Sequence, residues 1–191
     1  VFSPDYKVSL AEVLIPAADV SIQSSTAGFE ASGTGNMKFA LNGALTVGTY
    51  DGANIEIREA VGADNFYLFG LREEQIQEMR KNNAYNPRAC YENSEYLRRI
   101  LNAVNSNMFC EKDYVLLFKV IYEELLNRDY YFLLADLEAF NKALHDAEKD
   151  YTNPQKWAKK AIINVAKIGY FSSDRAVMEY AKNIWHIKPV D

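Results

Sequence analysis

The residues best suited to chemistry lie together between Ser24 and Gly43. The centre of this segment, Ser32-Gly-Thr-Gly35, combines two glycines with two hydroxyl side chains, and a helix-compatible stretch follows directly. Backbone amides at the start of a helix attract anions, because they have no partner inside the helix and the helix dipole adds to the attraction. Lys38 stands about one turn into this stretch. Its amine can therefore reach an anion, or a ligand that carries one.

Two common phosphate-binding patterns do not fit this segment. The pattern GxxxxGK[ST] is absent, and the dinucleotide pattern lacks its third glycine, because Met37 and Lys38 stand there instead. A lysine beside a phosphate cradle also suits a covalent link to pyridoxal phosphate. The residues alone leave a plainer alternative open, in which Lys38 is a solvated lysine after a capped glycine turn.

The run Glu30-Ala-Ser-Gly-Thr-Gly-Asn-Met-Lys38 resembles the cofactor-lysine signature of the α-glucan phosphorylases, the glycogen, starch and maltodextrin enzymes. The resemblance covers nearly the whole chain. It continues in the segments 6–11, 15–19, 41–45, 51–54, 171–175 and 180–185.

The resemblance implies a pyridoxal phosphate site with Lys38 as its catalytic residue. Lys38 would hold the cofactor covalently, and Gly33, Thr34 and Gly35 would line its 5′-phosphate. Tyr6 and Lys7 would flank the cofactor. Many family members have Arg where Lys7 stands, and the two are not equivalent, because only Arg offers a planar bidentate fork to a phosphate.

The resemblance also implies a substrate site and a reaction. Glu30, Ser32 and Gly33 would contact hydroxyl groups of the transferred glucosyl unit, and no metal is expected. The family cleaves terminal α-1,4-glucosyl units with inorganic phosphate to give glucose 1-phosphate, with the cofactor's phosphate as proton partner. The implied partners are an α-1,4-glucan, inorganic phosphate and a second copy of the enzyme in a homodimer.

The elements that must position this segment are strands and short helices. Eight of the nine glycines fall within residues 1–70. Ala44–Gly48 and Asn65–Phe69 are short apolar runs typical of a buried parallel sheet. Tyr50-Asp-Gly52 predicts a turn, and 37–42 predicts a helix that stops at Gly43.

After Leu71, apolar residues recur with a period of 3.6 residues, which predicts helices. We expect them over 73–81, from Pro87, over 95–104, 115–126 and 134–149, from Pro154, and from Ser172 or Ser173 to about Trp185. Asp136 is a candidate helix cap, and Ile162, Val165 and Ala166 are expected on the inner face of their helix.

The predicted fold class is α/β. By resemblance, the chain is the C-terminal part of a GT-B (Rossmann-like) glycosyltransferase domain, followed by a mostly helical C-terminal region. Residues 1–70 would be the cofactor-binding α/β part, incomplete at its N-terminus. Residues 71–191 would be the helical region of the same domain.

The composition and charge of the chain disfavour some classes of function. The 191 residues carry a net charge of −5, which disfavours a nucleic-acid partner, and no apolar run is long enough for a membrane helix. Cys90 and Cys110 are expected as free thiols, and the expected location is the cytoplasm, or a plastid in a plant.

The chain lacks an initiator Met, so we expect a piece of a longer protein. Residues 1–70 contain only Lys7, Lys38 and Arg58 as basic residues, so we expect no activity from this piece alone.

Two alternatives stay open at this point. One is a nucleotide-sugar glycosyltransferase of GT-B architecture, in which Lys38 would contact a phosphate without a covalent cofactor. The other is a non-catalytic module that docks on a partner through its helices.

Several further residues have structural interpretations. We expect no general-base role for His145 or His186, helix packing by Trp157 and Trp185, core or domain contacts for 130–132, and a solvated face for Glu56 and Glu59.

Overall fold

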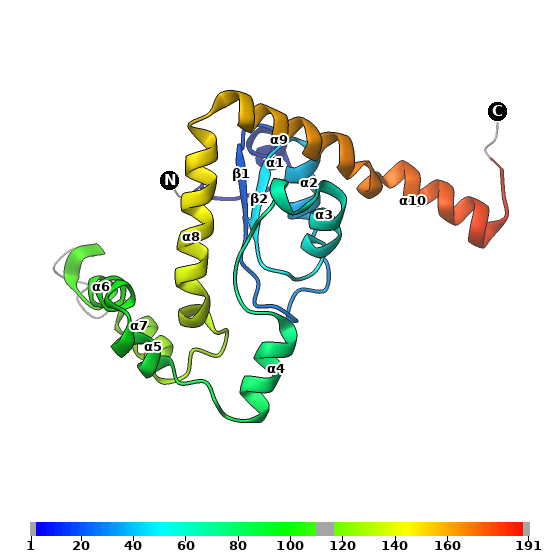
Figure 1. Cartoon of the computed structure of the whole chain (residues 1–191). Helices are drawn as coiled ribbons and strands as arrows, with labels where there is room; N and C mark the ends of the chain where they lie inside the picture. Colours follow the sequence, from blue (N-terminus) through cyan, green and yellow to red (C-terminus); the bar gives the residue numbers. More distant parts are fainter. Residues whose placement is uncertain (1–2, 110–116, 189–191) are drawn as a thin grey trace.

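The computed structural model describes residues 3–109 and 117–188, and its centre is a small parallel sheet with helices on both faces (Figure 1). The strands are β1 (Val20–Gln23), β2 (Leu45–Gly48) and β3 (Tyr67–Leu68), in the order β1-β2-β3. Both pairings are parallel, and all four residues of the central strand β2 are buried. The predicted α/β class and the two predicted strands are confirmed. Strand β1 was not predicted, because Ser21 and Gln23 interrupt its apolar character.

Two helices connect the strands and share one core. They are α2 (Gly35–Leu41) and α3 (Asn54–Val61), the second followed by the short turn η1 (Ala63–Asn65). The buried apolar residues of these two helices pack against two buried residues of neighbouring segments. Together they form a core of Ala40, Ile57, Val61, Phe66 and Ile168. Glu56 and Glu59 lie on the exposed face of α3, as predicted. A further helix, α1 (Val8–Leu14), precedes β1 and has no buried residue.

The long helix α8 (Leu133–Tyr151) runs beside the strands, and α9 (Pro154–Lys167) crosses at its end (Figure 1). A second core joins these helices to β2 and β3; it consists of Leu45, Val47, Tyr67, Phe69, Ala143, Ala147 and Trp157. Asn153 caps α9 through a 3.0 Å hydrogen bond from the Lys156 amide, next to the predicted Pro154 start.

The predicted inner face of α9 is wrong. Ile162 and Val165 are 69% and 47% exposed, and Ala166 is exposed as well. The inner face instead presents Trp157 and Asn164. The Asn164 amide donates to the carbonyl oxygens of Ala40 and Ala44 at 3.0 and 3.1 Å, so two buried backbone acceptors decide which side of α9 faces inward.

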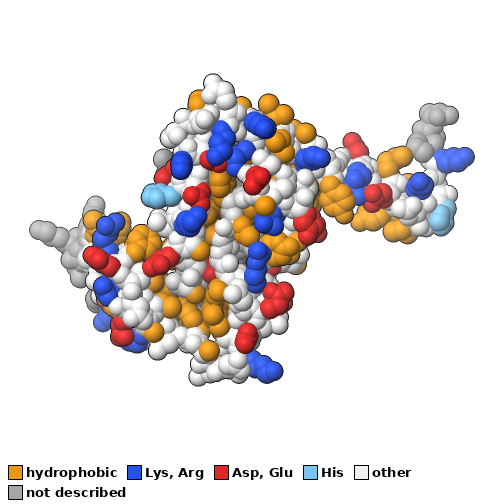
Figure 2. Space-filling view, in the orientation of Figure 1, with side chains coloured by type: hydrophobic (Ala, Val, Ile, Leu, Met, Phe, Trp, Pro, Cys, Tyr) orange, Lys and Arg blue, Asp and Glu red, His pale blue; other side chains and the backbone are white. Residues whose placement is uncertain are grey.

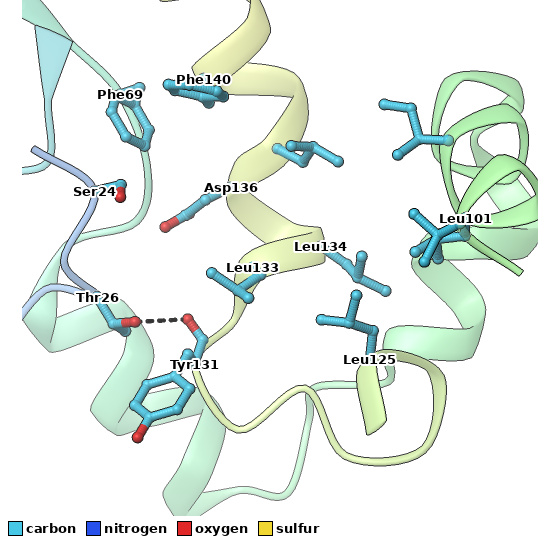
Figure 3. A pocket seen from close by; sticks show the side chains of 13 residues that line it. Ser24, Thr26, Phe69, Leu101, Leu125, Tyr131, Leu133, Leu134, Asp136 and Phe140 are labelled. Carbon is cyan, nitrogen blue, oxygen red and sulfur yellow. Dashed lines mark hydrogen bonds between the residues drawn. The ribbon is translucent and has the colours of Figure 1, made fainter. Parts of the chain in front are cut away.

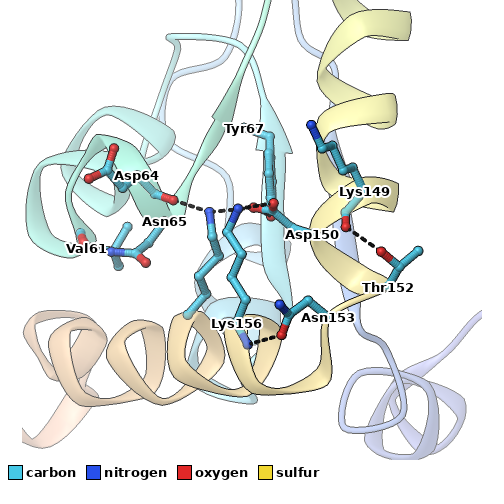
Figure 4. Close-up of polar contacts among 10 residues, drawn as sticks. Val61, Asp64, Asn65, Tyr67, Lys149, Asp150, Thr152, Asn153 and Lys156 are labelled. Carbon is cyan, nitrogen blue, oxygen red and sulfur yellow. Dashed lines mark hydrogen bonds and ion pairs between the residues drawn. The ribbon is translucent and has the colours of Figure 1, made fainter.

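Asp150 joins α8, α9 and β3 through a partly buried ion cluster (Figure 4). Its carboxylate accepts a hydrogen bond from Tyr67 Oη at 3.0 Å and pairs with Lys160 at 2.9 Å and with Lys156. Burial opposes ionisation, but the lysine and tyrosine donors outweigh it and lower the pKa of Asp150 to about 2. The cluster therefore ties the helical region to the sheet.

The remaining helices extend the molecule on two sides (Figure 1). Their bounds are α4 (Glu73–Lys81), α5 (Pro87–Asn93), α6 (Glu95–Val104), η2 (Asn107–Phe109), α7 (Lys119–Asn127), η4 (Ile168–Phe171), α10 (Ser173–Tyr180) and η5 (Ala181–Trp185). A core made by α6, α7 and α8 consists of Leu97, Leu101, Leu126 and Leu134. The predicted helix over 115–126 is present from Lys119, whereas 115–116 and Cys110 lie outside the described residues.

The prediction that Asp136 caps α8 is wrong. The helix begins at Leu133, and Asp129 accepts from the amides of Leu133 and Leu134 at 2.9 and 2.8 Å. Asp136 lies inside the first turn, is only 8% exposed, and accepts from the Leu71 amide at 2.8 Å. The helix therefore starts one residue earlier than predicted, and a carboxylate outside it satisfies its first amides.

The last segment, α10 and η5, projects away from the sheet (Figure 1), and apolar side chains are visible along it (Figure 2). Ser172 stands at the position before α10, but its hydroxyl makes no capping hydrogen bond. Trp185 is 55% exposed, and Tyr180 is its aromatic neighbour. The expectation that Trp185 packs between helices is therefore wrong within this chain, whereas Trp157 is buried as expected. In the described ranges, no helix has both the length and the apolar character needed to cross a bilayer.

Candidate functional site

The candidate site lies where β1 and β2 end. In parallel α/β sheets, ligands bind beyond the carboxyl ends of the strands, where the connecting loops meet. The loop after β1, residues 24–34, meets the loop after β2, residues 49–53. The first loop contains most of the predicted site residues, and the second determines its shape.

Asp51 is the main anchor of the first loop. Its Oδ1 accepts from the Gly28 amide at 2.9 Å, and its Oδ2 accepts from the amides of Phe29 and Glu30 at 3.3 and 2.8 Å. The side chain is only 6% exposed. Three backbone donors around one buried carboxylate form a charge-assisted arrangement that holds Glu30 in a defined position.

A buried amide network anchors the other end of the loop. Asn36 Nδ2 donates to Asn54 Oδ1 at 3.1 Å and to the Ser32 carbonyl at 3.3 Å. Asn54 Nδ2 donates to the Thr49 carbonyl at 3.1 Å. Asn36, Thr49 and Asn54 are each less than 5% exposed. Fully satisfied buried networks of this kind hold one backbone conformation.

The two loops touch at Gly52. The Ala53 amide donates to the Ser32 carbonyl at 2.8 Å, and an added Cβ on Gly52 would lie 2.6 Å from that same oxygen. Gly52 also has a φ of +49°, which L side chains rarely adopt. Only glycine allows this close approach, so the predicted turn at 50–52 also positions Ser32.

Helix α2 presents free amides at its start. The Thr34 side chain makes no capping bond, and the amides of Gly35 and Asn36 have no acceptor in the described part of the chain. Gly33 has a φ of +83°, and a Cβ on Gly35 would meet no heavy atom within 4 Å. Unpaired amides at a helix start, beside the open position of Gly35, fit an anion such as a phosphate group.

The other predicted residues of this loop are open to solvent. Lys38 lies one turn into α2 with an exposed side chain, and Glu30, Ser32 and Thr34 are exposed too. Glu30 lines a cavity of about 400 Å³ between the first loop and the start of α8. Glu30, Gly33, Thr34, Gly35 and Lys38 thus occupy one stretch of chain whose ends are both anchored.

Tyr6 and Lys7 are not joined to this loop by any hydrogen bond or ion pair between described residues. They directly precede α1, Tyr6 is 62% exposed, and the Lys7 amine pairs with Asp5 at 2.7 Å. Their assignment to the cofactor stays a prediction. In residues 3–109 and 117–188, no group of three His, Cys, Asp or Glu side chains is placed to hold a metal ion.

A carbohydrate phosphorylase family model matches residues 1–187. The chain belongs to the carbohydrate phosphorylase family. Its similarity to curated glycogen phosphorylases is 48% identity over 190 residues for the Synechocystis protein, 50% over 188 residues for the Chlamydia trachomatis protein, and 47% over 191 residues for the human brain form. These alignments cover 98–100% of this chain, but only 22–23% of each relative.

Sequence reasoning missed the residues that shape the site of this phosphorylase chain. The sequence places Asp51 in a predicted turn and in the resemblance, and Asn54 in the resemblance alone, but it assigns no role in the site to either, or to Thr49 and Asn36. One signal could have found them. The polar cluster Thr49 to Asn54 comes directly after the most apolar strand, and in a parallel sheet that position faces the ligand-binding edge.

Proposed function

We propose that this chain is the pyridoxal phosphate-binding part of an α-glucan phosphorylase, which cleaves terminal α-1,4-glucosyl units with inorganic phosphate to give glucose 1-phosphate. The observation that carries the proposal is the anchored loop from Glu30 to Lys38, within a chain 47–50% identical to glycogen phosphorylases. The loop combines free helix amides, an amine and an exposed carboxylate.

The residues of this loop fit the cofactor. The amides of Gly33, Thr34 and Gly35 would receive its phosphate, because the amide of Gly35 is unpaired and a Cβ at Gly35 would meet no heavy atom within 4 Å. The exposed Lys38 amine would hold its aldehyde carbon, with Tyr6 and Lys7 beside it. The bound cofactor supplies a phosphate group that can exchange a proton with the substrate phosphate.

Glu30, Ser32 and Gly33 would bind the sugar. The Glu30 carboxylate accepts hydrogen bonds from hydroxyl groups, and Asp51 fixes the backbone that carries it. A charged hydrogen bond of this kind contributes about 1.5–3 kcal/mol. Positioning by a rigid loop directs this binding energy to one orientation of the glucosyl unit.

The rest of the catalytic machinery would come from elsewhere in the intact protein. Two adjacent phosphates need several cationic groups, and residues 1–70 contain only three basic residues. We therefore propose that these 191 residues act as part of a GT-B glycosyltransferase, homodimeric and cytoplasmic, with an α-1,4-glucan and inorganic phosphate as substrates. The division into residues 1–70 and 71–191 belongs to the same proposal.

Borohydride reduction followed by mass spectrometry tests the cofactor assignment. The intact protein is reduced, digested and searched for a pyridoxyl group. We expect the group on Lys38 and on no other lysine of the chain. The Lys38→Arg variant is the matched control and should carry none. A reduced wild-type protein without pyridoxyl, or with the group on another lysine, would contradict the proposal.

A further inference from the structure

Two aromatic side chains, Phe29 and Tyr131, line the same cavity as Glu30, and we call them the aromatic wall. Phe29 and Tyr131 are 42% and 53% exposed, so both rings are open to a ligand in the cavity. The hydroxyl-bearing Ser24 and Ser25 line the same cavity. The cavity therefore combines apolar ring faces with hydroxyl and carboxylate groups.

The two rings are held in place from behind. Their centroids lie 5.8 Å apart in an edge-to-face arrangement, and the ring of Tyr130 packs edge-on against both at 5.9 and 5.0 Å. The Arg80 guanidinium lies 4.8 Å from the Phe29 centroid and 4.6 Å from that of Tyr130. Edge-to-face pairs and cation–π contacts both favour fixed ring positions.

The backbone of Tyr131 is also fixed to the site loop. Thr26 Oγ1 donates to the Tyr131 carbonyl at 2.8 Å, so the start of α8 is tied to the loop that contains Glu30 (Figure 3). The Arg80 guanidinium donates to the Tyr130 carbonyl at 2.8 Å from the other side. The wall is thus rigid although it is exposed, which lowers the entropic cost of binding a ligand.

We propose that Phe29 and Tyr131 form a platform for a glucosyl unit of the glucan, next to the unit bound by Glu30. This inference rests on the proposed function. A pyranose ring has apolar C–H faces and hydroxyl edges, so it packs on an aromatic ring while its edge bonds to hydroxyl and carboxylate groups. An anionic occupant is disfavoured, because Glu30 is acidic and the Arg80 guanidinium is already engaged by the rings of Phe29 and Tyr130.

Acceptor kinetics of the intact protein test the platform. Glucan synthesis is measured with maltoheptaose as acceptor and glucose 1-phosphate as donor, for Phe29→Ala and Tyr131→Ala. We expect the KM for maltoheptaose to rise about 10-fold in each variant, while the KM for glucose 1-phosphate stays within about twofold of wild type. Tyr131→Phe keeps the ring and should keep the wild-type KM.

Tyr170→Ala is the matched control. Tyr170 is 54% exposed, packs edge-to-face with Phe171 at 5.3 Å, and has the Arg175 guanidinium 4.0 Å from its centroid. It shares the exposure and contacts of the platform residues but does not line the cavity of Glu30. We expect its two KM values to equal those of wild type.

Two results would overturn the platform. One is an equal rise of both KM values, which means that the rings only support the loop. The other is an unchanged KM for maltoheptaose in both alanine variants. A wild-type protein without synthetic activity contradicts the proposed function instead. In that case, calorimetric titration with maltoheptaose decides about the platform: weaker binding by both alanine variants supports it, and equal or absent binding contradicts it.

Discussion

Asp51 Oδ2 accepts a hydrogen bond from the Glu30 amide at 2.8 Å, and this contact joins the loops that follow β1 and β2. The two residues are 21 positions apart, and their roles differ. Asp51 is buried and holds backbone, whereas Glu30 is exposed and faces the cavity. In the proposed function, the position of the sugar therefore depends on a buried carboxylate that holds the backbone of Glu30.

Replacing Asp51 with Ala should loosen the loop. Three amides lose a charged acceptor, so we expect the free energy of unfolding to fall by about 3 kcal/mol and the KM for glucose 1-phosphate to rise at least about 10-fold. Urea unfolding and initial rates of the intact protein measure both effects. The exposed Asp174 serves as control through Asp174→Ala, which should leave the KM unchanged and lower the free energy of unfolding by less than about 1 kcal/mol, because Asp174 lies in the first turn of α10. An Asp51→Ala enzyme with wild-type KM would show that the loop keeps its shape without this anchor.

Glu30→Gln should damage the sugar site and spare the cofactor. The amide keeps the shape of the side chain but loses the charged hydrogen bond, so we expect kcat/KM to fall about 10- to 100-fold. Pyridoxal phosphate content per chain should stay at the wild-type value. Glu56→Gln, on the exposed face of α3, is the control. If Glu30→Gln is isolated without cofactor and has normal kinetics after reconstitution, the assignment to the sugar is wrong.

Lys38→Ala should separate the covalent link from the anion site. The amides of α2 do not depend on the lysine, so the variant should still bind pyridoxal phosphate, but without activity. A small alkylamine added with the cofactor should restore part of the activity, because the amine replaces the missing group without its covalent tether. Phosphorolysis is measured against amine concentration, with Lys167→Ala as control. Binding of the cofactor without any rescue would mean that Lys38 does more than hold it.

The 191-residue chain by itself should release no glucose 1-phosphate from maltodextrin. The reason is electrostatic, because the first 70 residues supply too few cations for two neighbouring phosphates. Phosphorolysis is assayed with pyridoxal phosphate in excess, alongside the intact protein. Measurable turnover by the chain alone would show that its own residues complete the phosphate site.

Asp136→Asn should change how stability depends on pH. Burial raises the pKa of Asp136 to about 6 from the ordinary 3.8, although the Leu71 amide opposes the shift. Between these two values the folded protein binds more protons than the unfolded one, so its stability falls as the pH rises, by about 3 kcal/mol in total. The asparagine side chain cannot ionise, so the variant should not lose this stability as the pH rises.

Urea unfolding at pH 3.5 and pH 7 measures this difference. We expect the stability of Asp136→Asn relative to wild type to improve with pH by about 3 kcal/mol. The apolar cavity of about 290 Å³ beside Asp136 offers the carboxylate little solvation, which is why burial dominates (Figure 3). Asp174→Asn is the exposed control. A relative stability that does not change with pH would show that Asp136 is ionised equally in both states.

The sequence by itself determined the α/β class, two of the three strands and most helices. Short apolar runs and strong helical periodicity depend on local composition, so they need no tertiary information. The run from Glu30 to Lys38 also identifies the family from the sequence alone, and the family model and relatives confirm that identification. Its residue assignments stay predictions.

Only the tertiary structure decided which residues shape the loop and which faces are buried. Asp51, Asn54 and Asn36 act through contacts across 18 to 23 residues, which no local pattern reports. The inner face of α9 is the face that contains Asn164, and not the most apolar face of the helix. The reason is that two buried carbonyl groups need the Asn164 amide as a hydrogen-bond donor. Satisfying buried polar groups is a global condition of the fold, and it overrides local hydrophobic patterning where the two disagree.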